Sequence, residues 1–150
     1  MEMKPVLLFV HVLSVVVWVG GMFFADVCLR PVAAEQLPPP QRLPLLAAVL
    51  GRFFRAVTVA VLAILATGFW RFGETAGSSI PWHWHAMAMT GMLMAAIYAA
   101  ILLRFYPRLK AAVAVQDWPA GGAAMNAIRM LVLVNLNLGV LTVVVALLGS

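Results

Sequence analysis

Charge is scarce in this sequence. Of its 150 residues, 10% are Asp, Glu, Lys or Arg, whereas 65% are hydrophobic. A soluble domain of this length needs a far larger polar surface. The composition therefore excludes a soluble globular protein and predicts an integral membrane protein.

Cysteine and the common catalytic motifs are also scarce. Cys28 is the single cysteine, which excludes an internal disulfide and any zinc or iron–sulfur site built from several cysteines. The chain contains no nucleophile elbow, no glycine-rich phosphate loop and no paired carboxylates. Because hydrolytic enzymes are recognised by such motifs, a hydrolase is not expected.

Long apolar runs are abundant, and each is long enough to cross the hydrocarbon core of a bilayer as a helix. The runs show no alternation of apolar and polar residues, which favours helices over the strands of a membrane barrel. We predict an all-α fold, an integral membrane four-helix transmembrane bundle that forms a single transmembrane domain over residues 1–150. The helices are expected at about 5–28, 53–71, 84–106 and 119–149.

The basic residues predict how the helices are oriented. Loops are expected at 29–52, 72–83 and 107–118, and the prolines of the first loop favour an extended chain. Of the 10 Lys and Arg residues, all but Lys4 and Arg71 flank the first and third loops. The positive-inside rule then makes these two loops cytoplasmic and 72–83 the outer loop.

This orientation (N-out/C-out) predicts a multi-pass protein of the bacterial inner (plasma) membrane with its termini on the outer, periplasmic side. The net charge of +5 is explained by attraction to anionic lipid and by the positive-inside rule. The partner expected on these grounds is the lipid bilayer, and no nucleic acid is expected.

One histidine, His11, lies inside the first apolar run, which has no charged residue from Pro5 to Ala25. An ionisable side chain inside a membrane helix is costly and marks a candidate functional site that needs a partner. His83 and His85 begin the third helix from the same outer side. The predicted topology therefore brings the three histidines to one leaflet.

Helical spacing groups further residues with these histidines. The shared faces are, on the first helix, His11, Ser14, Trp18, Met22 and Ala25; on the third, His85, Met89, Met92 and Ala96, with Met87 and Met94 on a neighbouring stripe; and on the fourth, Asn135, Gly139, Thr142 and Ala146. Small and polar residues mark the packed side of a membrane helix. On the second helix, Ala60, Ala63 and Thr67 form a similar stripe. We expect these faces to point into the bundle.

Two cofactors fit this set of residues. A b-type haem (haem b) needs two axial ligands, which His11 and His85 would supply; its predicted binding residues are His11, His85, Trp18, Met22 and Asn135. Copper, above all Cu(I), is selected by imidazole and thioether ligands; its predicted ligands are His11, His85, His83, Met87 and Met89. The structural alternatives are a histidine that only hydrogen-bonds Ser14 or a backbone carbonyl, and methionines that only fill space.

The stretch HVLSVVVWVGGMFF, from His11 to Phe24, resembles the first helix of the copper-resistance D (CopD) family. It is also similar to HemJ, a small membrane protoporphyrinogen oxidase that carries b-type haem. The resemblance implies that His11 is a haem or metal ligand and that His85 lies near the second ligand position. HemJ proteins have a lysine where this chain has Met87, a departure that argues against protoporphyrinogen oxidase activity.

The leading expectation is a CopD-like membrane redox protein with one haem near the outer leaflet, acting in electron transfer or haem-dependent oxidoreduction. The second is a copper-binding or copper-transport protein of copper resistance. The third is a cofactor-free accessory subunit of a larger membrane complex. A membrane redox partner, a larger complex or a second copy of the chain is the protein partner that these expectations imply.

Overall fold

The computed structural model describes residues 3–75 and 79–149, and their regular structure is entirely helical. The elements are α1 (Met3–Phe23), η1 (Phe24–Leu29), α2 (Arg30–Gln36), α3 (Pro39–Glu74), α4 (Trp82–Ala100), η2 (Ile101–Phe105), α5 (Tyr106–Ala114) and α6 (Trp118–Leu148), where η denotes a π-helical segment. The predicted all-α fold is confirmed.

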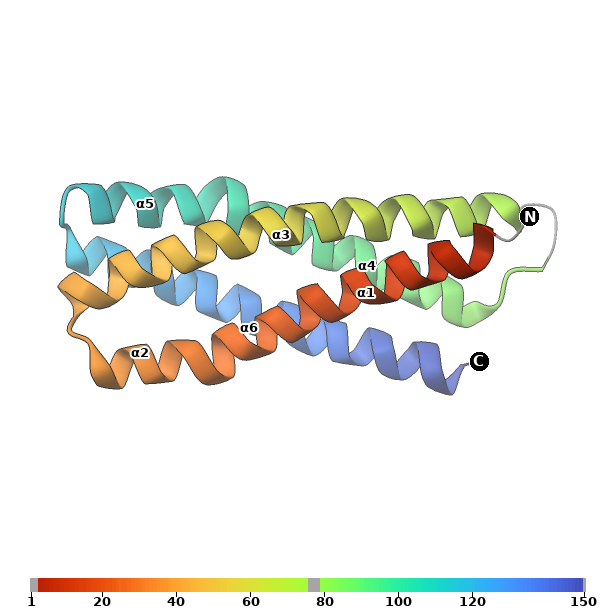
Figure 1. Ribbon diagram of the computed structural model, residues 1–150, viewed down its shortest axis with the longest axis horizontal. Coiled ribbons are helices and arrows are strands. Elements are labelled where there is room, and N and C mark those ends of the chain that lie inside the picture. The colour runs from red at the N-terminus through yellow and green to blue at the C-terminus, as the bar shows by residue number, and fades with distance from the viewer. Residues whose placement is uncertain (1–2, 76–78, 150) are drawn as a thin grey trace.

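Adjoining elements form four rods, each long and apolar enough to cross a membrane: Pro5–Gln36, Pro39–Glu74, Trp82–Ala114 and Trp118–Leu148. The rods lie side by side, with both chain ends and the α3–α4 connection at one end of the bundle (Figure 1). We call this the termini end, and the opposite end, where short turns join α2 to α3 and α5 to α6, the turn end. The chain is a multi-pass membrane protein; the side that each end faces stays a prediction.

Helix α6 is central to the packing. It contacts α4, α5, α1 and α3, while α1 also lies against α3. The core along these contacts includes Trp18, Phe54, Tyr98 and Ile128, each at most 6% exposed. Apolar side chains on the outside are left for the lipid, for example Leu103, which is 75% exposed.

The predicted loops 29–52 and 107–118 are wrong for most of their length, because helix continues through both of them except at the short turns. Pro39 and Pro40 occupy the first positions of α3, where the missing N–H groups would have no helical partner in any case. Beyond them an inward face continues the helix as an amphipathic segment; its buried residues are Leu43, Leu46, Ala47 and Leu50. The free energy gained by burying this face offsets the cost of the hydrogen bond that is missing at Pro44 inside the helix.

The two π-helical segments share a sequence cause. Pro31 follows the end of η1 by two residues, and Pro107 follows the end of η2 by two residues. A proline inside a helix cannot bond the carbonyl four residues earlier and collides with it. Those carbonyls belong to Val27 and Leu103, which lie within η1 and η2, so a widened turn accommodates each proline without breaking the rod.

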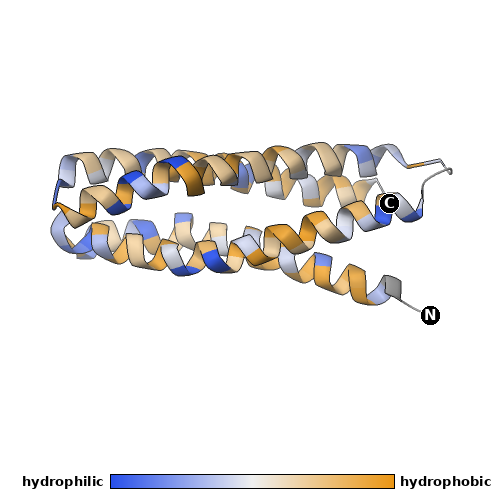
Figure 2. Ribbon diagram, turned by 90° about the horizontal axis from the view of Figure 1, so that it is seen from above, coloured by the Kyte–Doolittle hydropathy of each residue, from blue (hydrophilic) through white to orange (hydrophobic). Residues whose placement is uncertain are grey.

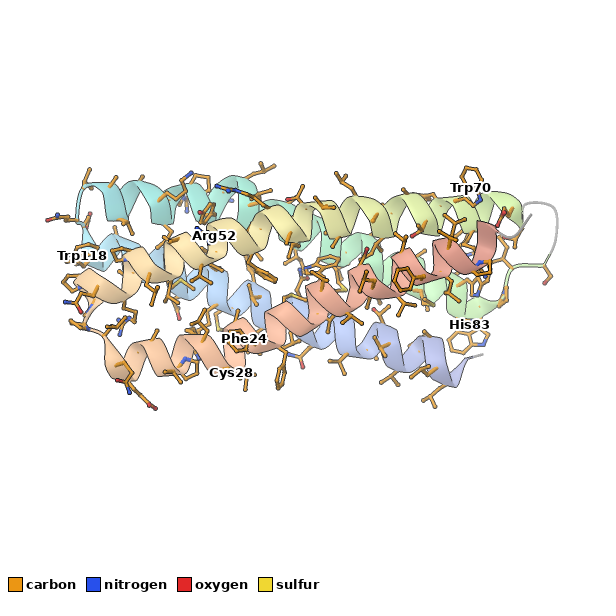
Figure 3. All side chains as sticks on the ribbon, in the orientation of Figure 1. Phe24, Cys28, Arg52, Trp70, His83 and Trp118 are labelled. Atoms are coloured by element: carbon orange, nitrogen blue, oxygen red, sulfur yellow. The ribbon has the colours of Figure 1, made fainter. Side chains whose placement is uncertain are left out.

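The charge-free part of each rod lies toward the termini end. In α3, no charged residue separates Arg55 from Arg71, a rise of about 24 Å. The hydrophilic residues gather mainly in the half toward the turn end (Figure 2), and Arg52 lies there while Trp70 and His83 lie at the termini end (Figure 3). This distribution of charge predicts that the bilayer covers the termini-end half and that the turn-end half extends beyond it as an amphipathic bundle.

A glycine pair in α1 provides a test of the α1–α3 contact. A Cβ at Gly21 would collide with the Phe53 ring of α3, whereas a Cβ at Gly20 would have nothing within 4 Å. We expect Gly21→Ala to destabilise the protein by about 1–3 kcal/mol through overpacking. Gly20→Ala should be neutral or up to about 1 kcal/mol stabilising because alanine favours helix. Unfolding of the two variants in detergent checks this, and equal stabilities would contradict the contact.

Candidate functional site

His11 lies in the α1–α3 contact near the termini end and is half-buried. Its Nδ1 is 2.8 Å from Oγ1 of Thr67 on α3. Gly68 of α3 lies beside the ring, since a Cβ there would stand 4.0 Å from His11 Cε1, an ordinary van der Waals contact. The costly intramembrane histidine thus has its partner on the second rod, and the partner is neither Ser14 nor another histidine.

The Thr67 hydroxyl determines which ring nitrogen of His11 carries the proton. Oγ1 lies 2.7 Å from the carbonyl oxygen of Ala63 and 3.2 Å from that of Ile64, so its single proton is donated to the backbone of α3. The hydroxyl oxygen therefore accepts, and His11 Nδ1–H donates to it. A neutral imidazole then keeps the lone pair on Nε2, which is how metal-binding histidines are commonly oriented by their surroundings.

Two further residues of α3 connect this histidine with α4. The guanidinium of Arg71 interacts electrostatically with His11 and stacks over the Trp84 ring at 5.1 Å. The Phe72 ring meets the His85 ring with centroids 5.9 Å apart. His11 and His85 therefore contact neighbouring turns of one helix, α3, from two different rods.

The depth of α4 relative to α1 follows from their shared contact with α6. A Cβ at Gly139 would lie 2.8 Å from Val19 on α1 and 3.2 Å from Met94 on α4. Both helices run from the termini end (Figure 1). His11 precedes Val19 by eight residues and Met87 precedes Met94 by seven, so both lie about 10–12 Å above this contact. Met87 and His11 share a level in the membrane.

The expected inward face of α4 is wrong. His85, Met89 and Met92 are exposed, Met89 by 74%. The neighbouring stripe faces the bundle instead, with Met94 and Tyr98 buried and Met87 half-buried. The reason is the hydroxyl of Tyr98, which hydrogen-bonds the carbonyl oxygen of Phe54 on α3 at 2.8 Å and fixes the rotation of α4.

His83 belongs to another contact. It lies at the termini end beside the last turn of α6 (Figure 3). A Cβ added at Gly149 would be 2.6 Å from the Cβ of His83. Its Nδ1 is buried without a hydrogen-bond partner among the described residues. Its surroundings are thus the end of α6 and Trp82, whose ring centroid lies 6.0 Å away.

The remaining predicted cofactor residues lie in the core. Trp18 and Met22 are 4% and 2% exposed, and the Trp18 ring meets Tyr98 edge-on at 6.1 Å. Asn135 is 1% exposed and donates from Nδ2 to the carbonyl oxygen of Met94 at 3.1 Å. In this arrangement all three side chains pack rods together.

The donor set limits which metals suit the site. Residues 3–75 and 79–149 contain no group of three or more His, Cys, Asp or Glu side chains that could hold a metal ion. Hard cations and zinc need several such ligands. Thioether sulfur is a ligand outside this set, and it suits Cu(I).

The sequence predicted His11 as a candidate and placed Thr67 on the inward stripe of the second helix, where it is buried. It did not predict that these two side chains bond each other, because no spacing rule connects the first run with the second. The contacts of Arg71 and Phe72 with α4 were missed for the same reason.

The fold and this histidine define a class: a polytopic helical membrane protein with a ligand-competent imidazole inside the bilayer. A family described as copper resistance protein D (CopD) matches residues 47–148, more than half of the chain. The chain therefore belongs to the CopD family, as its resemblance predicted. The match covers the residues that hold His11 from α3, whereas His11 itself precedes it. No curated protein and no solved structure matches the chain.

The role of Asn135 in helix packing can be tested against Asn137. Asn137 is exposed and bonds only the carbonyl of Leu133 on its own helix. We expect Asn135→Ala to destabilise the protein by about 1 kcal/mol, since it removes a hydrogen bond between α4 and α6. Asn137→Ala should stay within about 0.5 kcal/mol of the parent. Reversible unfolding in mixed micelles measures both, and a larger loss for Asn137→Ala would contradict the assignment.

Proposed function

We propose that this protein is a copper-binding membrane protein of copper resistance, and that His11 supplies an imidazole ligand near the termini end of the bundle. The observation that carries the proposal is the His11–Thr67 hydrogen bond through Nδ1. Because the Thr67 hydroxyl donates to the backbone of α3, the tautomer that fits this bond keeps the lone pair on Nε2. Membership of the CopD family supports copper as the metal.

Met87 is the further ligand that we favour. It lies at the level of His11 and is half-buried, whereas Met89 is 74% exposed on the other side of α4. His85 is the alternative, since it reaches the same turns of α3 through Phe72. An imidazole combined with a thioether selects Cu(I) over harder ions, so the reduced ion is the species that we expect the site to bind.

The positive-inside rule places this ligand set near the outer leaflet. Copper would then be captured from the outer side and held about two helical turns inside the bilayer. Because Arg71 acts electrostatically on His11, the surroundings of the site already carry one positive charge. This charge repels a divalent ion more strongly than a monovalent one, so it favours Cu(I) over a divalent ion with the same ligands.

Haem is the second candidate for the same nitrogen. An imidazole that donates its other N–H is also a suitable axial ligand of haem iron. The haem proposal requires His85, whose ring contacts Phe72, to face His11 across the macrocycle.

The copper proposal predicts a graded series of Cu(I) affinities. In lipid nanodiscs, against a competing Cu(I) chelator, His11→Ala should lose binding. Thr67→Val should weaken it by about 10–100-fold, as loss of an orienting hydrogen bond does. Met87→Leu should weaken binding, and Met89→Leu, the matched control, should leave it unchanged. Parent-like affinity in His11→Ala would exclude the proposed ligand, and loss in Met89→Leu but not in Met87→Leu would reverse the assignment on α4.

The haem alternative can be tested by the optical absorption spectrum of the purified protein. Protein expressed with ample haem would show a Soret band and sharp α and β bands after dithionite if haem were bound, and both His11→Ala and His85→Ala would lose them. The copper proposal predicts no Soret band in the parent protein, with copper retained after purification. A haem spectrum that disappears in both variants would overturn it.

A further inference from the structure

A second polar feature lies far from the histidines, in a cavity of about 220 Å³ between α3 and the η2–α5 segment. Its lining comprises Gly51, Phe54, Arg55, Thr58, Leu102, Tyr106 and Lys110. One water needs only about 10–15 Å³, so the cavity has room for a group many times larger. It opens at the surface of the bundle.

The lining carries two positive charges, Arg55 and Lys110, and no carboxylate. Among the described residues the one ion pair is Asp26–Arg30, at 3.6 Å, so neither cation of the cavity has an acidic partner there. Lys110 Nζ instead stands 5.3 Å from the Tyr106 ring centroid, which holds it over the opening. The positive charge of the lining is therefore complementary to the negative charge of an anion.

The hydroxyl groups of the lining are already engaged. Thr58 donates to the carbonyl oxygen of Phe54 at 2.7 Å, and Tyr106 donates to that of Ala47 at 3.1 Å. Gly51 permits this last approach, since a Cβ there would be 2.6 Å from the Tyr106 hydroxyl. An anion would therefore be bound by the two cations, through charge rather than through headgroup-specific hydrogen bonds.

The cavity lies at the edge of the membrane. Arg55 is the last charge of α3 before the uncharged stretch that leads to Arg71. Beyond it, on the same face of the helix, Val59 and Leu62 are 69% and 61% exposed. A ligand with its anion at Arg55 would therefore meet an apolar surface along the bilayer direction.

We propose that this cavity binds the phosphate of an anionic phospholipid, with the phosphate between Arg55 and Lys110 and an acyl chain along Val59 and Leu62. Basic pockets between membrane helices are suited to such headgroups. The cations give a preference for lipids with net negative charge, and the engaged hydroxyl groups give little preference among their headgroups.

The test compares two double variants that remove the same charge. Arg55→Gln/Lys110→Gln removes both cations of the cavity. Arg104→Gln/Arg108→Gln removes two cations that stack on Phe105 nearby, at 5.7 and 5.6 Å, and that do not line the cavity. Native mass spectrometry of the full-length protein would measure retention of phosphatidylglycerol and of phosphatidylcholine with the same acyl chains.

We expect the parent to retain phosphatidylglycerol over phosphatidylcholine, and the cavity variant to lose about thirty-fold in phosphatidylglycerol affinity, the effect of two basic residues near a membrane surface. The Arg104→Gln/Arg108→Gln control should remain within about three-fold of the parent, since it removes only diffuse attraction that salt screens. Equal losses in the two variants, or no lipid preference in the parent, would overturn the proposal.

Inorganic phosphate distinguishes a lipid site from a site for a soluble anion. Val59→Ser/Leu62→Ser should weaken phosphatidylglycerol retention while leaving any binding of inorganic phosphate unchanged. Inorganic phosphate that binds as tightly as the lipid, together with full lipid retention in this variant, would show a soluble-anion site and overturn the lipid assignment.

Discussion

The interior of a bilayer offers no water to a polar side chain, so a polar group there needs a partner within the protein. Several polar groups of the described spans find theirs on a neighbouring helix: His11 bonds Thr67, Thr142 bonds Thr90, and Tyr98 bonds the carbonyl of Phe54. These bonds help to fix the rotation of the helices about their axes. In the copper proposal, His11 differs from Thr142 and Tyr98 because its partner engages one ring nitrogen and leaves the second for a ligand.

The same constraint explains how much the sequence could predict. Charge scarcity and apolar runs predicted the all-α fold and the four spans, and the spacing of His11, Trp18 and Met22 predicted the inward face of α1. The face of α4 was wrong, because the periodicity of alanine and methionine is similar all round this helix. Contacts with other helices decide its rotation, among them the bond of Tyr98 to α3 and that of Thr90 to α6, and no rule of local spacing reveals a contact between distant segments.

The prolines at the turn end favour a loop by sequence alone, and this prediction is wrong. Proline excludes helix only where an interior N–H is needed, and Pro39 and Pro40 begin α3. Pro31 and Pro107 widen the rods at η1 and η2 instead of ending them. The result is a bundle with two parts: a charge-poor half that crosses the bilayer and carries His11, and a basic half that meets the membrane surface beside Arg55.

The copper proposal requires a neutral His11 imidazole that is protonated on Nδ1, with Nε2 free to bind Cu(I). The most direct measurement is nitrogen NMR of histidine-labelled protein in lipid, before and after addition of Cu(I), with His11→Ala to assign the signals. Cu(I) is diamagnetic, so the spectra remain interpretable. We expect a proton on Nδ1, a bare Nε2, and a larger shift of the Nε2 signal than of the Nδ1 signal when copper binds. A proton on Nε2 in the apo protein, or a spectrum of His11 that Cu(I) leaves unchanged, would contradict it.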